Sequence, residues 1–279
     1  MRSFRLAAAV AALALWATAC GSSTPAASRR DAGSTAPPPP TTGAPPTAAA
    51  PATSTVPAAS TTAPRFTPPT SSVPPSTVPV DAPPDPRLAD LAGAGQAVVV
   101  TAPSYGDTTA TLTAYERTTA GWKAVFGPWT ARVGSRGLAP PGAKREGDGR
   151  TPSGVYGFDF FFGVAADPGV QFPYRRVADG SIVWDDDPAS PLYNQWVDTH
   201  VQAAGADPEP MYVTPAYTYG AVIAYNTART PGLGSAIFLH VSTGGPTAGC
   251  VSLPADQLLD VLRWLDPARQ PRIVLGVAT

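Results

Sequence analysis

Hydrophobic and polar residues alternate along a series of short runs that begins near residue 96. The runs are rich in β-branched and aromatic residues, and turn-forming residues such as Gly and Pro separate many of them. They cover 96–101, 109–116, 122–126, 129–133, 155–162, 216–225, 235–240 and 272–276. The first four are typical of a meander of antiparallel strands with one buried and one solvated face. The sequence therefore predicts a mostly β domain.

A pattern of helical period follows Pro254. Pro254 fits the first turn of a helix, and Pro267 would end it. Between them the apolar residues recur at i, i+1, i+3, i+4 and i+7, which places on one face Leu258, Leu259, Val261, Leu262 and Leu265. We expect one amphipathic C-terminal helix against the core, and a second, short helix over 86–91.

Residues 163–215 fit neither pattern. Prolines interrupt this stretch often enough to break any long element. It also contains several aromatic residues, which favour an ordered structure because aromatic side chains seek burial or contact with a ligand. We expect an irregular lid or cleft wall. Its candidates for substrate contact are Tyr193, Asn194, Trp196 and Asp186, the last in an acidic run for which a solvated turn is the commoner explanation.

The N-terminal part of the chain has a different composition. Arg2 and Arg5 precede an apolar run that is too short to span a bilayer, which predicts a secretory signal peptide over 1–19. Small residues before Cys20 favour lipidation of that cysteine. The alternative is an ordinary signal peptide cleaved after Ala19. We expect an exported protein, anchored to the cell membrane by a lipid on Cys20 and facing the cell wall.

Residues 20–86 are rich in Pro, Thr, Ser and Ala and have one aromatic residue, Phe66. Such a segment cannot bury enough apolar surface to offset the entropy of ordering it. The sequence therefore predicts a disordered tether over 20–86 and a single folded domain over 87–279.

Charge and residue counts exclude several kinds of site. The formal net charge is -1 and no basic stripe is present, so we expect no nucleic-acid partner. With two cysteines and two histidines in the whole chain, a His/Cys zinc site is not expected, and we predict no metal and no cofactor. The charged, glycine-rich loop at 144–150 is not a P-loop. Lys144 and Arg150 within it are candidates for binding a substrate carboxylate.

The strongest chemical signal lies between Ile237 and Leu253. An apolar run leads to His240, a turn-rich loop follows, and Cys250 begins the next apolar run. A thiol needs a base to become a strong nucleophile, and an imidazole can take its proton. Gly249 would let backbone amides approach a reacting carbonyl, as an oxyanion hole requires. The alternative is a buried structural cysteine beside a core histidine.

These residues resemble the L,D-transpeptidase catalytic domain (YkuD-type) of bacterial cell-wall enzymes. His240 matches the family histidine, and the segment from Thr247 to Val251 matches the Ser/Thr-His-Gly-Cys-hydrophobic motif, with Ala248 in place of the histidine. Ser252 stands where the family often has Arg. Residues 151–156 resemble its Thr-Pro-x-Gly-x-aromatic segment. The resemblance covers about residues 96 to 279 and implies a β-sandwich.

The resemblance also implies a reaction. Cys250 would attack a carbonyl of a peptidoglycan stem peptide and form a thioester, while His240 acts as base and then acid. Amides near Gly249 and Cys250 would hold the oxyanion, and Ser242 or a backbone carbonyl would orient the imidazole. Thr247, Ser242 and Ser252 are further candidates for substrate contact. An L,D-carboxypeptidase and a catalytically silent wall-binding lipoprotein remain alternatives.

Overall fold

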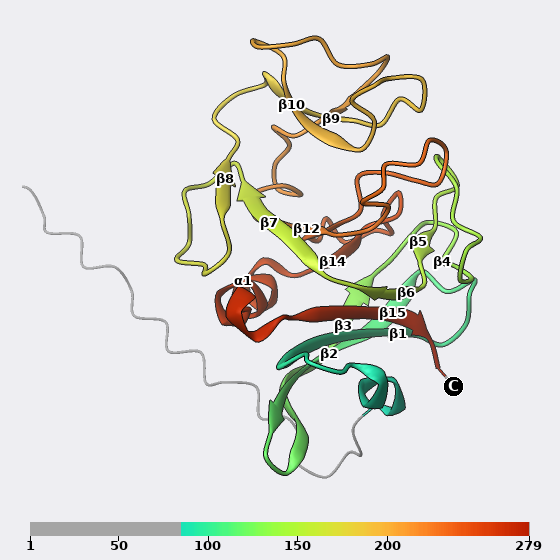
Figure 1. The fold of residues 1–279 in the computed structure, drawn as a ribbon, viewed down its shortest axis with the longest axis vertical. Helices are drawn as coiled ribbons and strands as arrows, with labels where there is room; N and C mark the ends of the chain where they lie inside the picture. Colours follow the sequence, from blue (N-terminus) through green and yellow to red (C-terminus); the bar gives the residue numbers. More distant parts are fainter. Residues whose placement is uncertain (1–84, 279) are drawn as a thin grey trace, which may run out of the picture. The chain divides into compact units, whose positions relative to one another are not determined.

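The computed structural model describes residues 85–278. The predicted signal peptide, Cys20 and nearly all of the predicted tether lie outside the described residues. The described part is mostly β with one α-helix near its C-terminal end, as the sequence predicts (Figure 1). None of its helices is long and apolar enough to cross a membrane.

One ten-stranded sheet of mixed direction forms the body of the fold. Its strands stand in the order β6-β15-β1-β2-β3-β14-β13-β12-β7-β8. Three neighbouring pairs are parallel, namely β1 with β15, β13 with β14, and β7 with β8. The bounds are β1 Gln96–Ala102, β2 Thr109–Thr118, β3 Gly121–Arg132, β6 Gly154–Tyr156, β7 Phe158–Gly163, β8 Tyr174–Arg176, β12 Gly220–Ile223, β13 Phe238–Val241, β14 Val251–Leu253 and β15 Arg272–Val277.

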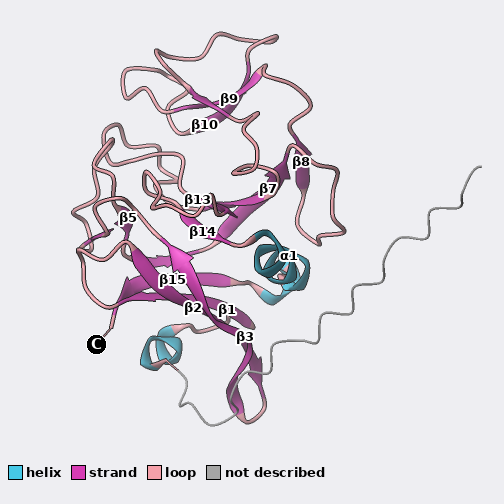
Figure 2. Ribbon diagram, turned by 180° about the vertical axis from the view of Figure 1, so that it is seen from behind, coloured by secondary structure: helices cyan, strands magenta, loops and turns pink. Residues whose placement is uncertain are grey.

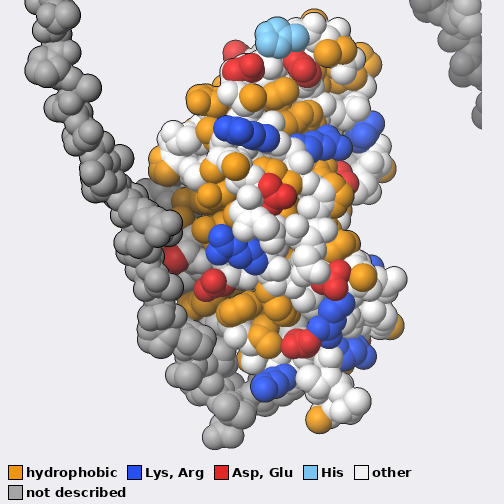
Figure 3. Space-filling model, turned by 90° about the vertical axis from the view of Figure 1, so that its left-hand side faces the viewer, with side chains coloured by type: hydrophobic (Ala, Val, Ile, Leu, Met, Phe, Trp, Pro, Cys, Tyr) orange, Lys and Arg blue, Asp and Glu red, His pale blue; other side chains and the backbone are white. Residues whose placement is uncertain are grey.

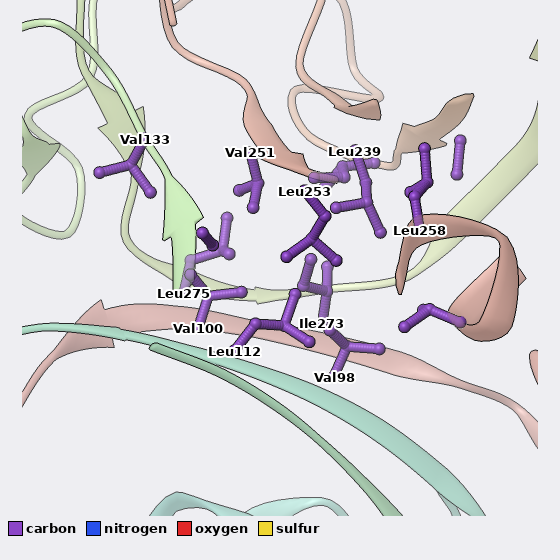
Figure 4. Packing of buried hydrophobic residues seen from close by; sticks show 14 of the residues in the cluster. Val98, Val100, Leu112, Val133, Leu239, Val251, Leu253, Leu258, Ile273 and Leu275 are labelled. Atoms are coloured by element: carbon purple, nitrogen blue, oxygen red, sulfur yellow. The ribbon is translucent and has the colours of Figure 1, made fainter. Parts of the chain in front are cut away.

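The sheet curls so that its two halves face each other across one hydrophobic core, which we call the main core (Figures 1 and 2). Figure 4 shows Val98, Leu112 and Ile273 of one half pointing toward Leu239 and Leu253 of the other. The α-helix α1 (Ala255–Trp264) covers this core with buried residues of its apolar face. The predicted helix is therefore confirmed, and the predicted sandwich takes the form of one curled sheet.

Strand β1 is buried on both faces, which explains its continuous apolar sequence. Val98 and Val100 enter the main core, whereas Ala97 and Val99 pack on the opposite side against Leu88. Leu88 belongs to the short 3-10 helix η1 (Pro86–Asp90). The short N-terminal helix is thus confirmed, and it covers the outer face of the strand.

Strand β3 differs from the prediction of two separate strands over 122–126 and 129–133. It is continuous, and irregularities in its pairing with β2 absorb the Gly127–Pro128 step. Gly127 has a φ of 86°, and a Cβ there would lie 2.4 Å from Leu112 O. Glycine at this position therefore allows the two strands to stay paired through the irregularity.

Residues 163–215, which we call the lid, contain more regular structure than expected. A three-stranded sheet joins β9 (Ile182–Asp185) to β10 (Gln195–Asp198) and β11 (Glu209–Pro210) (Figure 1). Beneath it a second cluster of buried residues, the lid core, joins the lid to β7, β12 and β13. The remaining short elements are β4 (Leu138–Ala139), β5 (Thr151–Pro152) and η2 (Pro267–Arg269).

Candidate active site

Neighbouring parallel strands position the predicted nucleophile and base. In β13 the side chains of Leu239 and Val241 enter the main core, so Phe238 and His240 lie on the opposite face. Cys250 directly precedes β14 and belongs with Phe238 to the lid core. The pairing of β13 with β14 therefore brings the thiol and the imidazole to the same face of the sheet.

The Cys250 side chain is held against the segment that leads into β13. Its Sγ accepts a hydrogen bond from Phe238 N at 3.4 Å and donates one to Ala236 O at 3.3 Å. Burial raises the pKa of the thiol well above its ordinary value, and the charge of Glu209 raises it further. The Phe238 amide and Lys144 lower it by less. The resting group is a thiol at neutral pH, so attack requires a base.

His240 is buried, and its hydrogen bond favours the tautomer in which Nε2 is free to act as the base. Its Nδ1 lies 2.9 Å from Val241 O, and because a carbonyl can only accept, Nδ1 carries the proton. Burial lowers the pKa of the imidazole, opposed by hydrogen bonds to backbone at Val241 and Ala216. Nε2 is therefore unprotonated at neutral pH. The orienter of His240 is a backbone carbonyl, and the Tyr217 ring packs edge-on against the imidazole at 5.4 Å between centroids.

Both side chains line one cavity of about 300 Å³. The loop before Cys250 forms part of its wall, including Thr247, Ala248 and Gly249. The titratable side chains of the wall, besides the thiol and the imidazole, are Lys144, Glu146, Asp186, Glu209 and Tyr217. This volume suits the end of a peptide chain, at the lower limit for small-molecule sites.

Two threonines fix the backbone at the nucleophile. Thr247 Oγ1 donates to Cys250 O at 2.7 Å, and Thr151 Oγ1 donates to the same oxygen at 3.1 Å. Thr151 is fully buried and also accepts a hydrogen bond from Gly134 N at 2.9 Å. The Thr-Pro-x-Gly segment and the cysteine motif, which are distant in sequence, therefore meet at this carbonyl. Thr247 shapes the loop that carries the thiol.

The two amides predicted for the oxyanion differ in their hydrogen bonding. Gly249 N–H donates to Thr247 Oγ1 at 3.2 Å. Cys250 N–H has no hydrogen-bond acceptor within residues 85–278. A Cβ at Gly249 would lie 3.1 Å from Arg150 O, so glycine permits a close approach of the two backbones. The free donor for an oxyanion is accordingly the amide of Cys250, while that of Gly249 is engaged.

The acidic run of the lid consists of Asp185, Asp186 and Asp187, and one of these side chains lines the cavity. Asp186 lines it, and burial raises the pKa of this carboxyl to about 6, with the charges of Glu146, Asp185 and Asp187 adding to the shift. Asp185 is fully buried and accepts hydrogen bonds from Ser190 Oγ at 2.6 Å and Gly205 N at 2.8 Å. Asp187 accepts from lid amides. Asp185 and Asp187 therefore hold the lid together.

The two basic candidates of the loop at 144–150 have structural partners. Lys144 is buried and lies 2.7 Å from Asp148 in an ion pair, so the cation that reaches the cavity wall is already neutralised. Arg150 donates to Leu138 O at 3.0 Å and does not line the cavity. Arg150 thus lies apart from the cavity wall, whereas Lys144 is part of it.

The aromatic and amide candidates of the lid lie outside the cavity wall and contact residues that hold the lid in place. Tyr193 is buried, with its hydroxyl bonded to Glu146, and Asn194 Oδ1 accepts from Ala236 N at 3.2 Å. Trp196 packs on the lid core. None of Tyr193, Asn194 and Trp196 lines the cavity, and the contacts that the structure gives them hold the lid to the sheet.

The serine candidates and the second histidine also lie off the cavity wall. Ser242 Oγ accepts from Gly244 N at 3.1 Å, a local turn contact. Ser252 pairs in register with His240, and its buried hydroxyl has no hydrogen-bond partner among the described residues. It does not cap α1, whose N-cap is Pro254. His200 is exposed and lies 3.6 Å from Asp198, which leaves His240 as the histidine of the cavity.

Two residues of the site, Glu209 and Tyr217, are not predicted by any motif in the sequence. Tyr217 packs against His240, and its hydroxyl donates to the Glu209 carboxylate. Glu209 is in β11, between two prolines in the lid, and no motif surrounds it. Tyr217 lies within the predicted strand over 216–225, but it is more than twenty residues before His240 in the sequence. Only the pairing of distant segments reveals either residue.

Comparison with known families gives one match. The chain matches the YkuD family, described as the L,D-transpeptidase catalytic domain, over residues 105–274, which is more than half of its 279 residues. No curated protein and no solved structure matches it. The match includes the Thr-Pro-x-Gly segment, His240, Glu209, Tyr217 and Cys250, so the cavity described above lies within it. The chain belongs to the L,D-transpeptidase catalytic domain family.

Proposed function

We propose that this chain is a cysteine acyltransferase that cross-links the stem peptides of peptidoglycan. The observation that carries the proposal is the cavity shared by Cys250 and His240, in which the thiol is protonated and the imidazole is neutral. A thiol and a neutral base on one wall are the two groups that a thioester mechanism needs. The catalytic domain would occupy residues 87–279.

The first half of the reaction acylates the enzyme. Cys250 Sγ attacks the carbonyl at the L-centre of the diamino acid in a donor stem peptide while His240 Nε2 takes the thiol proton. The oxyanion then lies near Cys250 N–H, which has no hydrogen-bond acceptor among the described residues. As the C–N bond breaks, His240 gives its proton to the departing D-alanine amine. The product is a thioester on Cys250 with a neutral imidazole.

The second half transfers the acyl group. Attack by the side-chain amine of a neighbouring stem forms the cross-link, and attack by water instead releases a tripeptide. We favour transfer because Asp186 and Glu209 give the cavity wall carboxyl groups that attract an incoming ammonium group. An L,D-carboxypeptidase uses the same thioester, and a silent wall-binding protein forms none. Product analysis separates the three.

The proposed location is the outer face of the cell membrane. Cys20 would carry a lipid, and residues 20–86 would form the tether from the membrane to the catalytic domain. We expect the mature protein to begin at a diacylglyceryl-modified Cys20 and to partition with membranes. A Cys20→Ala protein should be released. If it stayed with the membrane fraction to the same extent, the lipid anchor would be excluded.

A carbapenem tests the nucleophile. Incubation should add the mass of one carbapenem to the protein at Cys250, and Cys250→Ala should remain unmodified. Cys250→Ser should react far more slowly, because an alcohol is a weaker nucleophile beside the same base. Equal labelling of Cys250→Ala and the parent would show that another residue is the nucleophile.

A further inference from the structure

We propose that Glu209 accepts the first proton from the ammonium group of the acceptor stem, and so serves the aminolysis step alone. The inference rests on the proposed function and adds a catalytic residue to it. The site described so far explains formation of the thioester. It does not explain how a protonated amine becomes a nucleophile beside it.

The chemistry of the acceptor requires two proton acceptors. A lysine-like side-chain amine has a pKa of about 10.4, so roughly one molecule in 2,500 is unprotonated at pH 7. One proton must leave before the nitrogen can attack the thioester, and a second must leave as the amide forms. His240 is neutral after acylation and can take the second proton. The first needs another base in the same cavity.

Glu209 is placed to be that base. Its side chain lines the cavity with Cys250 and His240. Tyr217 donates its hydroxyl to Oε1 of Glu209, and no hydrogen bond of a described residue to Oε2 is found, so one oxygen remains for a ligand. The Tyr217 ring packs on the His240 ring. The tyrosine thus fixes the carboxylate relative to the imidazole.

The other two carboxyl groups of the wall are less suited. Glu146 accepts hydrogen bonds from Tyr193, from Ser235 Oγ at 2.7 Å and from Gly147 N at 3.2 Å, so both of its oxygens are engaged. Among the carboxyl groups of the wall, Glu209 is the one bonded to Tyr217, whose ring packs on His240. Its charge also raises the pKa of the Cys250 thiol.

The surroundings of Glu209 also suit a proton acceptor at neutral pH. The pKa of its carboxyl is raised to about 7, chiefly by burial; the Tyr217 hydrogen bond opposes the shift, and the charges of Asp186 and Glu146 add to it. A base works best when its pKa lies near the working pH. The titratable and charged groups on the neighbouring walls are Tyr217, Asp186, Glu146, Cys250, His240 and Lys144 with its partner Asp148.

The protons and electrons balance through the step. The ammonium group gives a proton to the Glu209 carboxylate, and its nitrogen lone pair attacks the thioester carbonyl. The C–S bond breaks as the intermediate collapses, His240 takes the second nitrogen proton and returns it to the departing thiolate, and Glu209 releases its proton to solvent. The products are the amide cross-link and the free Cys250 thiol.

The test compares Glu209→Gln with the parent and with Asp207→Asn. Asp207 is an exposed carboxylate two residues away with a φ of 49°, a conformation that Asn accepts. Each full-length protein is incubated with purified tetrapeptide stems, once alone and once with hydroxylamine. Hydroxylamine is uncharged at neutral pH and needs no prior loss of a proton. Acyl-enzyme, tripeptide, dimer and hydroxamate are quantified by mass spectrometry.

We expect Glu209→Gln to form dimer about 100-fold more slowly than the parent at pH 7, the usual size of a general-base contribution. Its acyl-enzyme should form at least as fast, because loss of the charge lowers the pKa of the thiol, and its hydroxamate yield should stay within a few-fold of the parent. The difference in dimer formation between Glu209→Gln and the parent should shrink as the pH approaches the pKa of the acceptor amine, because the amine then loses its proton without a base. Asp207→Asn should match the parent throughout.

Other outcomes overturn the inference. Dimer formation by Glu209→Gln at the parental rate, an equal loss of hydroxamate, or a failure to acylate would each contradict a role of Glu209 that is confined to the acceptor proton. If Asp186→Asn lost dimer formation and Glu209→Gln did not, the role would belong to Asp186.

In the parent, the dimer-to-tripeptide ratio should rise with pH and reach a plateau near pH 7. A ratio that rose tenfold per pH unit up to pH 10 would contradict the proposed role of Glu209. Absence of acyl-enzyme in the parent would instead reject the proposed function.

Discussion

At the scale of single residues, burial determines the resting state of the site. The Cys250 thiol has a raised pKa and the His240 imidazole a lowered pKa, both chiefly because burial disfavours the charged form. The pair therefore rests as thiol and imidazole, and not as a thiolate-imidazolium ion pair. Proton transfer accompanies the attack on the substrate.

This protonation state predicts the reactivity of Cys250 toward a small alkylating agent. Alkylation by iodoacetamide should be slow at pH 7 and should rise about tenfold per pH unit up to pH 9, because only the thiolate reacts. Glu209→Gln should react faster than the parent at each pH. Peptide mass mapping at Cys250 gives the rates. A rate that is already constant at pH 7 would indicate an ion pair and contradict the assignment.

The carboxyl groups of the cavity wall predict how the stability of the folded chain depends on pH. Burial raises the pKa of Glu209 to about 7 and that of Asp186 to about 6, both above their unfolded values. The folded chain therefore binds these protons more tightly, so their contribution to stability is present at acid pH and is lost as the pH rises through 6 and 7. Glu209→Gln should melt at a higher temperature than the parent near pH 8 and at the same temperature near pH 4.

Thermal unfolding followed by circular dichroism provides the measurement. Asp207→Asn is the matched control, since it removes an exposed carboxylate from the same segment. If the difference between Glu209→Gln and the parent were the same near pH 4 and pH 8, the carboxyl would not titrate in the folded protein as described.

At the scale of elements, the loop that carries Cys250 depends on Thr151. This buried hydroxyl joins Gly134 N to Cys250 O. Thr151→Val keeps the shape but leaves a buried amide without its acceptor, so unfolding should require about 1–3 kcal/mol less free energy and acylation should slow. Thr151→Ser retains the hydroxyl and should acylate like the parent. Urea titration and carbapenem mass shifts measure the two effects, and indistinguishable behaviour of the two variants would remove Thr151 from the site.

The same scale shows what the sequence could predict. Alternation and helical spacing located most strands and α1, because these patterns record which face of an element is buried. The lid sheet could not be predicted because its strands are short and interrupted by proline. The pattern predicts two strands in place of β3 because Gly127 and Pro128 mark a turn in most contexts. Cys250 and His240 are close in sequence and follow a motif. Glu209 and Tyr217 reach the cavity through contacts between distant segments, which a local pattern does not record.

At the scale of the whole molecule, the part that the structure describes is expected to work without the N-terminal region. The cavity, the main core and the lid core all lie within residues 85–278. Figure 3 shows acidic and basic side chains interspersed over one face of this part. A fragment of residues 85–279 should therefore fold and acylate with a carbapenem at the rate of the full chain. A fragment that failed to fold, or that acylated more than tenfold more slowly, would assign the N-terminal region a role in the site.

The most direct test of the account follows the intact protein by mass spectrometry during incubation with purified tetrapeptide stems. We predict a transient adduct on Cys250 with the mass of the tetrapeptide acyl group after loss of D-alanine, followed by cross-linked dimer, and neither species with Cys250→Ala. Tripeptide without dimer at millimolar acceptor would identify an L,D-carboxypeptidase. Dimer formation by Cys250→Ala, or no adduct and no product from the parent, would contradict the central claim that Cys250 carries the acyl group.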